Sequence, residues 1–258
     1  MAVLGIDIGS AASKGILMEE RKTLASFECP SGGDLRKTAE KIRKELMAQA
    51  GLSVKQITYT VATGFGSHQV TYADEVKTDI SCHGKGINLL SPSVRTAVDV
   101  GDLYSKACRI DARGNVVNFL LSGKCAGGSG RVLQIIAKVL QLKVEEIGAL
   151  SLKSKKHIDF STGCVVFAES EAVSRIAEGA AKENLLAGIH RALAAQLFTL
   201  AERIGIEKDF ALVGGGARDV GLVKAMEEIS GDRVIVPPDP HMTAALGAAI
   251  MAIEKTDN

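Results

Sequence analysis

Two copies of one eight-residue pattern constrain the fold of this chain more than any other feature of its sequence. Residues 7–14 (DIGSAASK) recur as residues 99–106 (DVGDLYSK), with Asp, Gly, Ser and Lys in identical register. In both copies a largely apolar run precedes the aspartate and a short strand is expected after the lysine, so each copy predicts a β-hairpin. The shared motif in a shared context indicates a duplication, and we expect two lobes of common ancestry.

The rest of the chain alternates short β-branched runs with longer segments of helical period, which is typical of an α/β fold. A length of 258 residues allows one large domain or two small ones. We expect lobe I to comprise residues 1–92 and about 241–258, and lobe II to comprise residues 93–240. The pattern further predicts helices over 34–50, 132–142 and 185–204, a long helical stretch from Val173, and strands over 57–62, 116–121, 210–213 and 233–236.

The composition describes a globular chain without a strong charge. A hydrophobic fraction of 46% with 24% charged residues can close a substantial core, which argues against a disordered role. The formal net charge of +1 lacks the excess of basic residues that is typical of binding to nucleic acid or anionic lipid. No apolar run approaches the roughly 18 residues of a spanning helix, and no signal-peptide pattern opens the chain, so we expect a cytoplasmic protein.

The two hairpins carry the residue types that bind nucleotide phosphates. A carboxylate at the end of a strand can hold hydrated Mg²⁺, and the backbone N–H groups of the tight turn that follows can cradle a phosphate. Asp7 and Asp99 are therefore the candidate catalytic residues, and either could also orient the attacking water. Two such turns facing one another would clamp a triphosphate. Each Asp-x-Gly turn taken alone could instead merely close a hairpin.

A third candidate contact is the run Gly214-Gly215-Gly216, between a predicted buried strand and a helix. Glycine permits close approach of the backbone to a ligand, and the following helix offers its N-terminus. The residues that we expect to contact the nucleotide share these turns: Gly9, Ser10, Ser13, Lys14, Gly101, Lys106, Gly214, Gly215 and Gly216.

The order of these motifs, followed by a closing helix of small residues over 244–249, resembles the superfamily of acetate and sugar kinases, heat-shock ATPases and actin. The resemblance implies a two-lobed actin-like (ribonuclease H-like) ATPase fold with ATP in the cleft between the lobes.

The five cysteines show no CxxC pair and no disulfide spacing, so reduced thiols are expected. Cys125 and Cys164 stand out because each lies near the start of a predicted helix, where the helix dipole stabilises a thiolate and an anionic cluster. Two thiols are half of the ligands of a four-cysteine iron–sulfur cluster, and a symmetric dimer would supply the other two. Two buried thiols are the alternative. The remaining cysteines are expected in the core, Cys82 beside a core or capping His83.

Five segments resemble the activators of 2-hydroxyacyl-CoA dehydratases and the ATPase subunits of benzoyl-CoA reductase. These segments are residues 4–10 (LGIDIGS), 62–66 (ATGFG), 81–83 (SCH), 124–131 (KCAGGSGR) and 164–171 (CVVFAESE). The similarity runs over nearly the whole chain, and the two cysteine motifs are specific to this family within the superfamily.

The resemblance implies a dimer that shares one [4Fe-4S] cluster and hydrolyses ATP to push a low-potential electron into a partner enzyme. By this resemblance Cys125 and Cys164 are the cluster ligands. Our hypothesis is that reduced ferredoxin or flavodoxin loads the cluster. The partner is an acyl-CoA dehydratase or the catalytic component of a benzoyl-CoA reductase. Hydrolysis would rotate the lobes and move the helices that follow the two cysteines.

The second hairpin departs from this family, which reads Asp-Ile-Gly-Gly-Gln-Asp-x-Lys there. In this chain Asp102, Leu103 and Tyr104 stand where the family has Gly, Gln and Asp. If that Gln positions water or phosphate, hydrolysis here uses another group, or this subunit works beside a differing one. The departure favours a subunit of a benzoyl-CoA reductase-like complex, and a free-standing activator stays open.

Two functions of other classes are compatible with the same motifs. A small-metabolite kinase of the superfamily would be a monomer without iron, although so short a chain shows no insertion that would bind an acceptor. A nucleotide-dependent sensor or scaffold would bind ATP and contain no iron.

Overall fold

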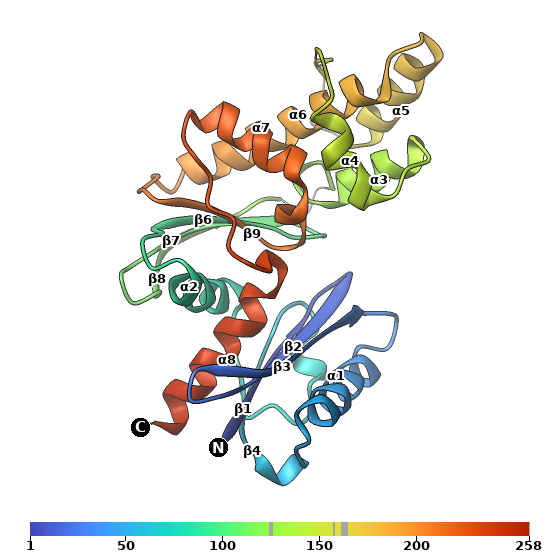
Figure 1. Cartoon of the computed structure of the whole chain (residues 1–258). Coiled ribbons are helices and arrows are strands. Elements are labelled where there is room, and N and C mark those ends of the chain that lie inside the picture. Colours follow the sequence, from blue (N-terminus) through green and yellow to red (C-terminus); the bar gives the residue numbers. More distant parts are fainter. Residues whose placement is uncertain (124–125, 157, 161–164, 258) are drawn as a thin grey trace. The chain divides into compact units, whose positions relative to one another are not determined.

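The computed structural model describes residues 1–123, 126–156, 158–160 and 165–257, and the chain divides into two units (Figure 1). Unit 1 consists of Met1–Ser93, Ile110–Val116 and Met242–Asn258. Unit 2 consists of Val94–Arg109 and Val117–His241. Each unit has its own sheet and its own hydrophobic core.

Unit 1 is built on a five-stranded sheet with the order β3-β2-β1-β4-β5. The β1–β2 and β2–β3 pairs are antiparallel, whereas β4 runs parallel to β1 and β5 parallel to β4. The strands are β1 (Ala2–Ile8), β2 (Ala12–Glu19), β3 (Lys22–Pro30), β4 (Ile57–Thr63) and β5 (Glu75–Val76). The helices are α1 (Leu35–Ala50), α2 (Asp79–Leu90) and α8 (Thr243–Thr256), with short 3-10 helices η1 (Val54–Gln56) and η2 (Ser67–Gln69).

Helices cover both faces of this sheet, which is why β1 is buried along its whole length. Successive side chains of a strand point to opposite faces. Leu4, Ile6 and Ile8 share a core with Ile42 and Leu46 of α1, whereas the neighbouring residue Val3 belongs to the core formed with α8. A strand that is buried on both faces has no simple alternation of apolar and polar residues, and β1 is accordingly apolar from Ala2 to Ile8 apart from Gly5 and Asp7.

Helix α1 confirms the expected helix over 34–50, and its ends follow from local capping. The side chain of Asp34 accepts a hydrogen bond from the N–H of Lys37 at 3.0 Å, which satisfies one of the free donors of the first turn. Gly51 ends the helix in the left-handed conformation, with φ of 65°.

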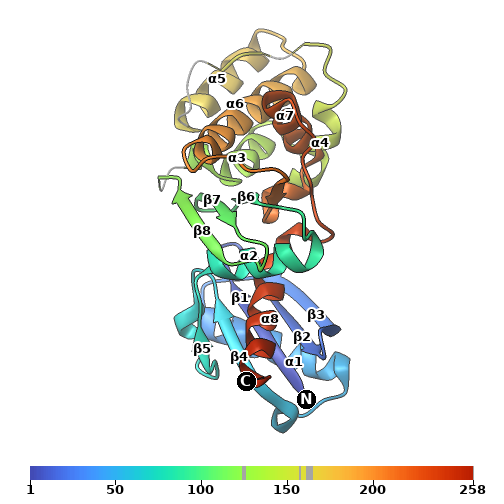
Figure 2. The same cartoon turned by 90° about the vertical axis from the view of Figure 1, so that its left-hand side faces the viewer.

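Gly5 allows helix α8 to lie directly on β1. A Cβ atom at position 5 would meet the backbone of Ala245 and Ala249. Figure 2 shows α8 lying over β1 and β4. The small residues of α8 and the glycine on β1 therefore together allow the helix to pack closely on the strand.

Unit 2 is built on a four-stranded sheet with the order β8-β7-β6-β9, in which β7 is antiparallel and β9 parallel to β6. The strands are β6 (Thr96–Val100), β7 (Ser105–Ile110), β8 (Val116–Leu121) and β9 (Phe210–Val213). The helices are α3 (Arg131–Val139), α4 (Val144–Ser151), α5 (Val165–Ala177), α6 (Lys182–Glu202) and α7 (Val220–Ser230). Short 3-10 helices are η3 (Ala126–Gly128), η4 (Gly215–Arg218) and η5 (Pro240–Met242), the last of which reaches the border with unit 1.

The apolar helix expected over 185–204 is α6, which lies at the centre of the core of unit 2. The helical stretch expected from Val173 is different in the structure. It begins earlier, at Val165, and Gly179, with φ of 84°, separates α5 from α6. The strand expected over 233–236 is reduced to one bridge between Ala211 and Ile235, since Pro237 and Pro238 follow and have no N–H to extend a ladder.

The two sheets confirm the duplication that the repeated motif predicts. The order β3-β2-β1-β4 of unit 1 matches β8-β7-β6-β9 of unit 2, with the same antiparallel hairpin and the same parallel neighbour. The Ala211–Ile235 bridge is parallel and occupies the place that β5 has in unit 1. Across the described residues of both units, no helix is long and apolar enough to span a bilayer.

We expect Gly5→Ala to lower the free energy of unfolding by about 1–3 kcal/mol, because the added methyl group forces α8 away from β1. Gly33→Ala is the matched control, since a Cβ atom there has no heavy atom within 4 Å. Urea unfolding followed by circular dichroism measures both. A Gly5→Ala midpoint equal to that of the unmodified chain would contradict the close packing of α8 on β1.

Candidate nucleotide site

The first hairpin holds a nearly buried ion pair at the end of its strands. The antiparallel register of β1 and β2 pairs Asp7 with Lys14. Lys14 Nζ lies 3.4 Å from Asp7 Oδ2 and donates to the carbonyl of Ala12 at 3.1 Å, and both charged side chains are only 11–13% exposed. Gly9 lies in the turn, where a Cβ atom would meet that same carbonyl. The turn is therefore tight, and its half-buried backbone at Gly9 and Ser10 lies next to the ion pair.

Ser13 supports this turn from inside unit 1. Its side chain is fully buried, and its hydroxyl lies 2.7 Å from the hydroxyl of Ser31. Ser31 in turn donates to the carbonyl of Gly9 at 2.7 Å. The structure thus places Ser13, which the motif suggested as a nucleotide contact, where it acts on the turn through Ser31.

The second hairpin repeats the ion pair with tighter geometry. The register of β6 and β7 pairs Asp99 with Lys106, and Lys106 Nζ donates to Asp99 Oδ2 at 3.0 Å. Both side chains are 8% exposed, and the same Nζ atom lies 5.0 Å from the ring centre of Tyr104. At Gly101 a Cβ atom would lie 2.7 Å from the carbonyl oxygen of Tyr104, so this turn also requires glycine. Each hairpin therefore presents a carboxylate, a lysine and a tight turn in the same arrangement.

A glycine from the neighbouring parallel strand lies behind each carboxylate. Gly64 follows β4 with φ of 87°, and Gly214 follows β9 with φ of 82°. A Cβ atom at Gly64 would meet the Asp7 carboxylate, and one at Gly214 would meet that of Asp99. These positions demand glycine for both their backbone conformation and their space.

The correspondence extends two residues further along each loop. A Cβ atom at Gly66 would lie 2.5 Å from the side chain of Ile8, and one at Gly216 would meet the side chain of Val100. Ile8 and Val100 each follow the hairpin aspartate, so both loops approach their hairpins in the same way. Gly215, between the two contacts of the second loop, is exposed, and a Cβ atom there would have no neighbour within 4 Å.

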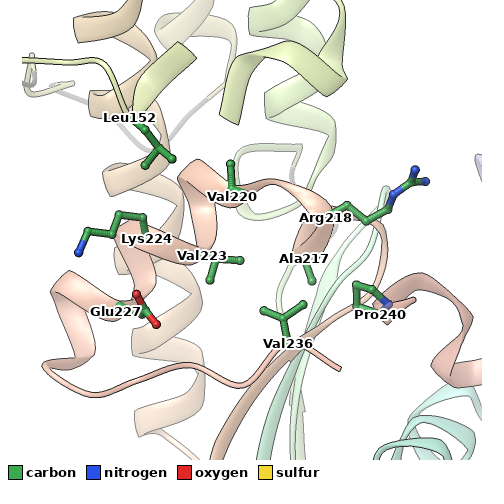
Figure 3. Close-up of a pocket in the computed structure, with 9 residues that line it drawn as sticks. All are labelled: Leu152, Ala217, Arg218, Val220, Val223, Lys224, Glu227, Val236 and Pro240. Carbon is green, nitrogen blue, oxygen red and sulfur yellow. The ribbon is translucent and has the colours of Figure 1, made fainter. Parts of the chain in front are cut away.

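A pocket of about 510 Å³ adjoins the second glycine loop. Figure 3 shows Ala217 and Arg218, which directly follow the loop, beside Pro240. The carbonyl oxygen of Pro240 accepts a hydrogen bond from the N–H of Gly214 at 2.9 Å. The other residues that line the pocket combine apolar and charged side chains: Leu152, Val220, Val223, Lys224, Glu227 and Val236. The cavity thus offers a largely apolar wall and a cationic edge next to the glycine loop.

Residues 4–252 match the BadF/BadG/BcrA/BcrD ATPase family. This chain belongs to that ATPase family. It is 38% identical over 254 residues to an activator of lactoyl-CoA dehydratase from Anaerotignum propionicum, covering 98% of each chain. It is 31% identical over 257 residues to one of the subunits of benzoyl-CoA reductase from Thauera aromatica, covering 95% of this chain and 91% of that one.

The fold is that of the two-lobed actin-like ATPases. The activator of the 2-hydroxyisocaproyl-CoA dehydratase from Clostridium difficile, solved with bound ADPNP, matches with a TM-score of 0.93 and 36% identity, over 100% of this chain and 96% of that one. The expected α/β class and the expected ATPase activity are thereby confirmed. ATP binding follows for this family member, and the two hairpins remain our prediction for where its phosphates lie.

The predicted cluster ligands of this family member, Cys125 and Cys164, lie outside the described residues. Their described neighbours begin helices: η3 starts at Ala126, and α5 starts at Val165. Ala168 and Ala172 of α5 share the core of unit 2 with Leu133 and Ile136 of α3. The two cysteines therefore adjoin segments that lead into helices of one packed core.

The other three cysteines of the ATPase are buried free thiols, as expected. Burial raises the pKa of the Cys82 thiol to about 12. His83 Nδ1 lies 2.8 Å from Thr243 Oγ1, so this histidine joins α2 to the start of α8. Within the described part of the chain, no group of three or more His, Cys, Asp or Glu residues could hold a metal ion. Cys82-His83 is thus a core pair in this part of the chain.

Gly64 and Gly66 are close to the first hairpin in the structure, although the sequence did not predict them as site residues. Their signal was present, because a Gly-x-Gly after a buried strand occurs in both lobes, at positions 64–66 and 214–216. Residues 214–216 form a glycine triplet, whereas Phe65 separates the two glycines of residues 64–66. Only the strand order shows that the two loops occupy equivalent places.

We expect native Cys82 to resist alkylation at pH 8. A thiol with a pKa of about 12 has about 1000-fold less thiolate there than one with the ordinary value of 9.0, and the thiolate is the reacting form. Iodoacetamide labelling of Cys82, read by peptide mass spectrometry, measures the rate. Labelling in 8 M urea is the control. Equal rates in the native and unfolded chain would contradict the burial of this thiol.

Proposed function

We propose that this chain uses ATP hydrolysis to drive a low-potential electron into a CoA-thioester enzyme, as an acyl-CoA dehydratase activator or a benzoyl-CoA reductase ATPase subunit. The observation that carries the proposal is the pair of Asp–Lys hairpins, each backed by a glycine loop, in a member of the BadF/BadG/BcrA/BcrD ATPase family. The family supplies the reaction, and the hairpins supply the groups that such a reaction requires.

The phosphates of ATP bind at the two hairpin turns and at Gly214–Gly216. Backbone N–H groups of the tight turns at Gly9 and Gly101 donate to phosphate oxygens, and Lys14 and Lys106 offset the phosphate charge. Bound Mg²⁺ supplies further charge neutralisation, and Asp7 and Asp99 would hold it through its water ligands. One of these carboxylates orients the water that attacks the terminal phosphate.

The adenine binds in the cavity beside the second glycine loop. The cavity is large enough for a purine ring, and its apolar wall includes Ala217 and Val236. Arg218 lies at its edge, where a guanidinium group can stack on an aromatic base (Figure 3). Pro240, which is bonded to the glycine loop, joins this cavity to the phosphate end of the site.

Cys125 and Cys164 are the ligands of a [4Fe-4S] cluster that two subunits share. The donor set fits, because the three other cysteines are buried in the cores and these two thiols flank the helical segments that begin at Ala126 and Val165. When bound, the cluster supplies the low-potential electron. Two thiols per chain require a second subunit to complete the ligand set, either another copy or a related chain.

The partner is the catalytic component of an acyl-CoA dehydratase or of a benzoyl-CoA reductase, and reduced ferredoxin or flavodoxin is the donor. The replacements at Asp102, Leu103 and Tyr104 favoured the reductase type. The identity of 38% to the lactoyl-CoA dehydratase activator, against 31% to the reductase subunit, favours the activator type. We therefore propose a dehydratase activator first and the reductase subunit second.

We expect Asp99→Asn to lower kcat for ATP hydrolysis about 100- to 1000-fold, because a neutral amide holds hydrated Mg²⁺ and orients the attacking water less well than a carboxylate does. Asp111→Asn is the matched control: this aspartate lies in the next turn and accepts only hydrogen bonds from its own turn residues Arg113 and Asn115. Phosphate release under anaerobic conditions, with a thermal melt of each variant, measures the effect. A folded Asp99→Asn protein with unreduced kcat would overturn the site assignment.

We expect anaerobically purified protein to be brown and to contain about four iron and four sulfide per dimer. Cys125→Ala should lose this iron, whereas Cys29→Ala, which removes a core thiol, should keep it. Iron and sulfide analysis with visible spectroscopy measures both variants. A colourless dimer or monomer that still hydrolyses ATP would favour a sensor, and ATP-dependent phosphorylation of a sugar or acid by a colourless protein would favour a kinase.

A further inference from the structure

The turn of the second hairpin is bonded to the start of helix α3. The N–H of Gly130 donates to the carbonyl of Gly101 at 2.8 Å, and the hydroxyl of Ser129 donates to the carbonyl of Asp102 at 2.8 Å. Gly130 is the residue that precedes α3, and η3 begins at Ala126, one residue after Cys125. The phosphate-binding turn and the segment after the cysteine are therefore adjacent parts of unit 2.

The side chain of Asp102 strengthens this junction. Arg131 donates to both carboxylate oxygens, at 2.8 Å from one nitrogen and 3.4 Å from the other, and Gln134 donates to the same carboxylate at 3.3 Å. Arg131 and Gln134 are three residues apart and thus share one face of α3. The Asp102 side chain is only 11% exposed, and its hydrogen bond to Arg131, together with its charge, raises the pKa of the Arg131 guanidinium.

These bonds show how the Asp102 carboxylate is engaged. Both of its oxygens accept hydrogen bonds from α3, Oδ2 from Arg131 and Oδ1 from Arg131 and Gln134. A glycine at this position would remove that acceptor of Arg131 and Gln134. The side chain of Asp102 therefore provides a charged link between the turn and α3.

We propose that Asp102 is a positioning residue that transmits the nucleotide state of the second hairpin to residues 126–134 through Arg131 and Gln134. This inference rests on the proposed function, because it assumes that the hairpin binds the phosphates. Loss of the terminal phosphate moves the turn, and the bonds of Arg131 and Gln134 to the Asp102 carboxylate carry that movement into α3. The bonds of Ser129 and Gly130 to backbone carbonyls keep the two segments adjacent. The first hairpin has a different support, since Ser31 of its own unit bonds the carbonyl of Gly9.

Hydrogen exchange of the holoprotein dimer with ADP and with ADPNP tests this link. We expect peptides that cover residues 126–134 to differ in exchange between the two nucleotides. In Asp102→Ala this difference should fall to less than half, while the Kd for ADPNP stays within about threefold. The number of electrons delivered per ATP should fall about 10-fold, within the range of about 5- to 150-fold that coupling between two sites reaches.

Arg131→Gln provides a second variant that keeps the hairpin intact, and it should reduce the exchange difference less than Asp102→Ala, because Gln134 still donates to Asp102. The double variant should be no worse than Asp102→Ala alone, because Asp102→Ala already removes the contacts of both Arg131 and Gln134. Asp111→Ala, which removes a turn carboxylate without a bond to α3, should keep the full difference.

Two results would overturn the inference. The first is an unchanged exchange difference in a folded Asp102→Ala or Arg131→Gln protein. The second is a loss of ADPNP affinity in parallel with the exchange difference, which would make Asp102 a phosphate ligand. The ATPase rate and the iron content of the unmodified chain test the proposed function independently of this inference.

Discussion

The structure of the candidate site depends on a buried ion pair at the end of each hairpin. Lys14 faces Asp7 in unit 1 and Lys106 faces Asp99 in unit 2, and all four side chains are at most 13% exposed. Removing two charges from water is costly, so such a pair is stable only when its geometry is well matched. Here the antiparallel register sets the match, because it places the two residues opposite one another. A glycine behind each carboxylate leaves the space that this arrangement needs.

The two hairpins share the Asp–Lys pair and the glycine behind it, but different residues support their turns. In unit 1, Ser13 and Ser31 form a buried hydroxyl pair that holds the carbonyl of Gly9. In unit 2 the counterpart Ser105 is also fully buried, yet among the described residues its hydroxyl has no hydrogen-bond partner. The second turn is held instead by Gly130, Ser129 and Arg131. The first turn is thus bonded to Ser31, which follows β3, and the second turn is bonded to the start of α3.

Much of this arrangement could be predicted from the sequence. The Asp, Gly, Ser and Lys shared by residues 7–14 and 99–106 predicted two equivalent hairpins, and the helix ending at Gly51 was visible from its period and its stop signal. Other features could not be predicted. The inward position of Ser13 depends on Ser31, which a third strand brings beside it. Residues 233–236 form only the bridge at Ile235, because the two prolines that follow cannot extend the ladder. The apolar β-branched residues of this segment had predicted a longer strand.

The sequence alone determined the α/β class, the duplication and the residue types at the two turns, because these follow from local spacing and periodicity. Only the tertiary structure decided that Gly64 and Gly214 lie behind the two carboxylates and that Asp102 bonds to α3. Gly64 is distant from Asp7 along the chain, and Gly214 is distant from Asp99. Their meeting depends on which strand lies beside β1 and β6, and strand order is a property of the whole sheet, whose local segments do not encode it.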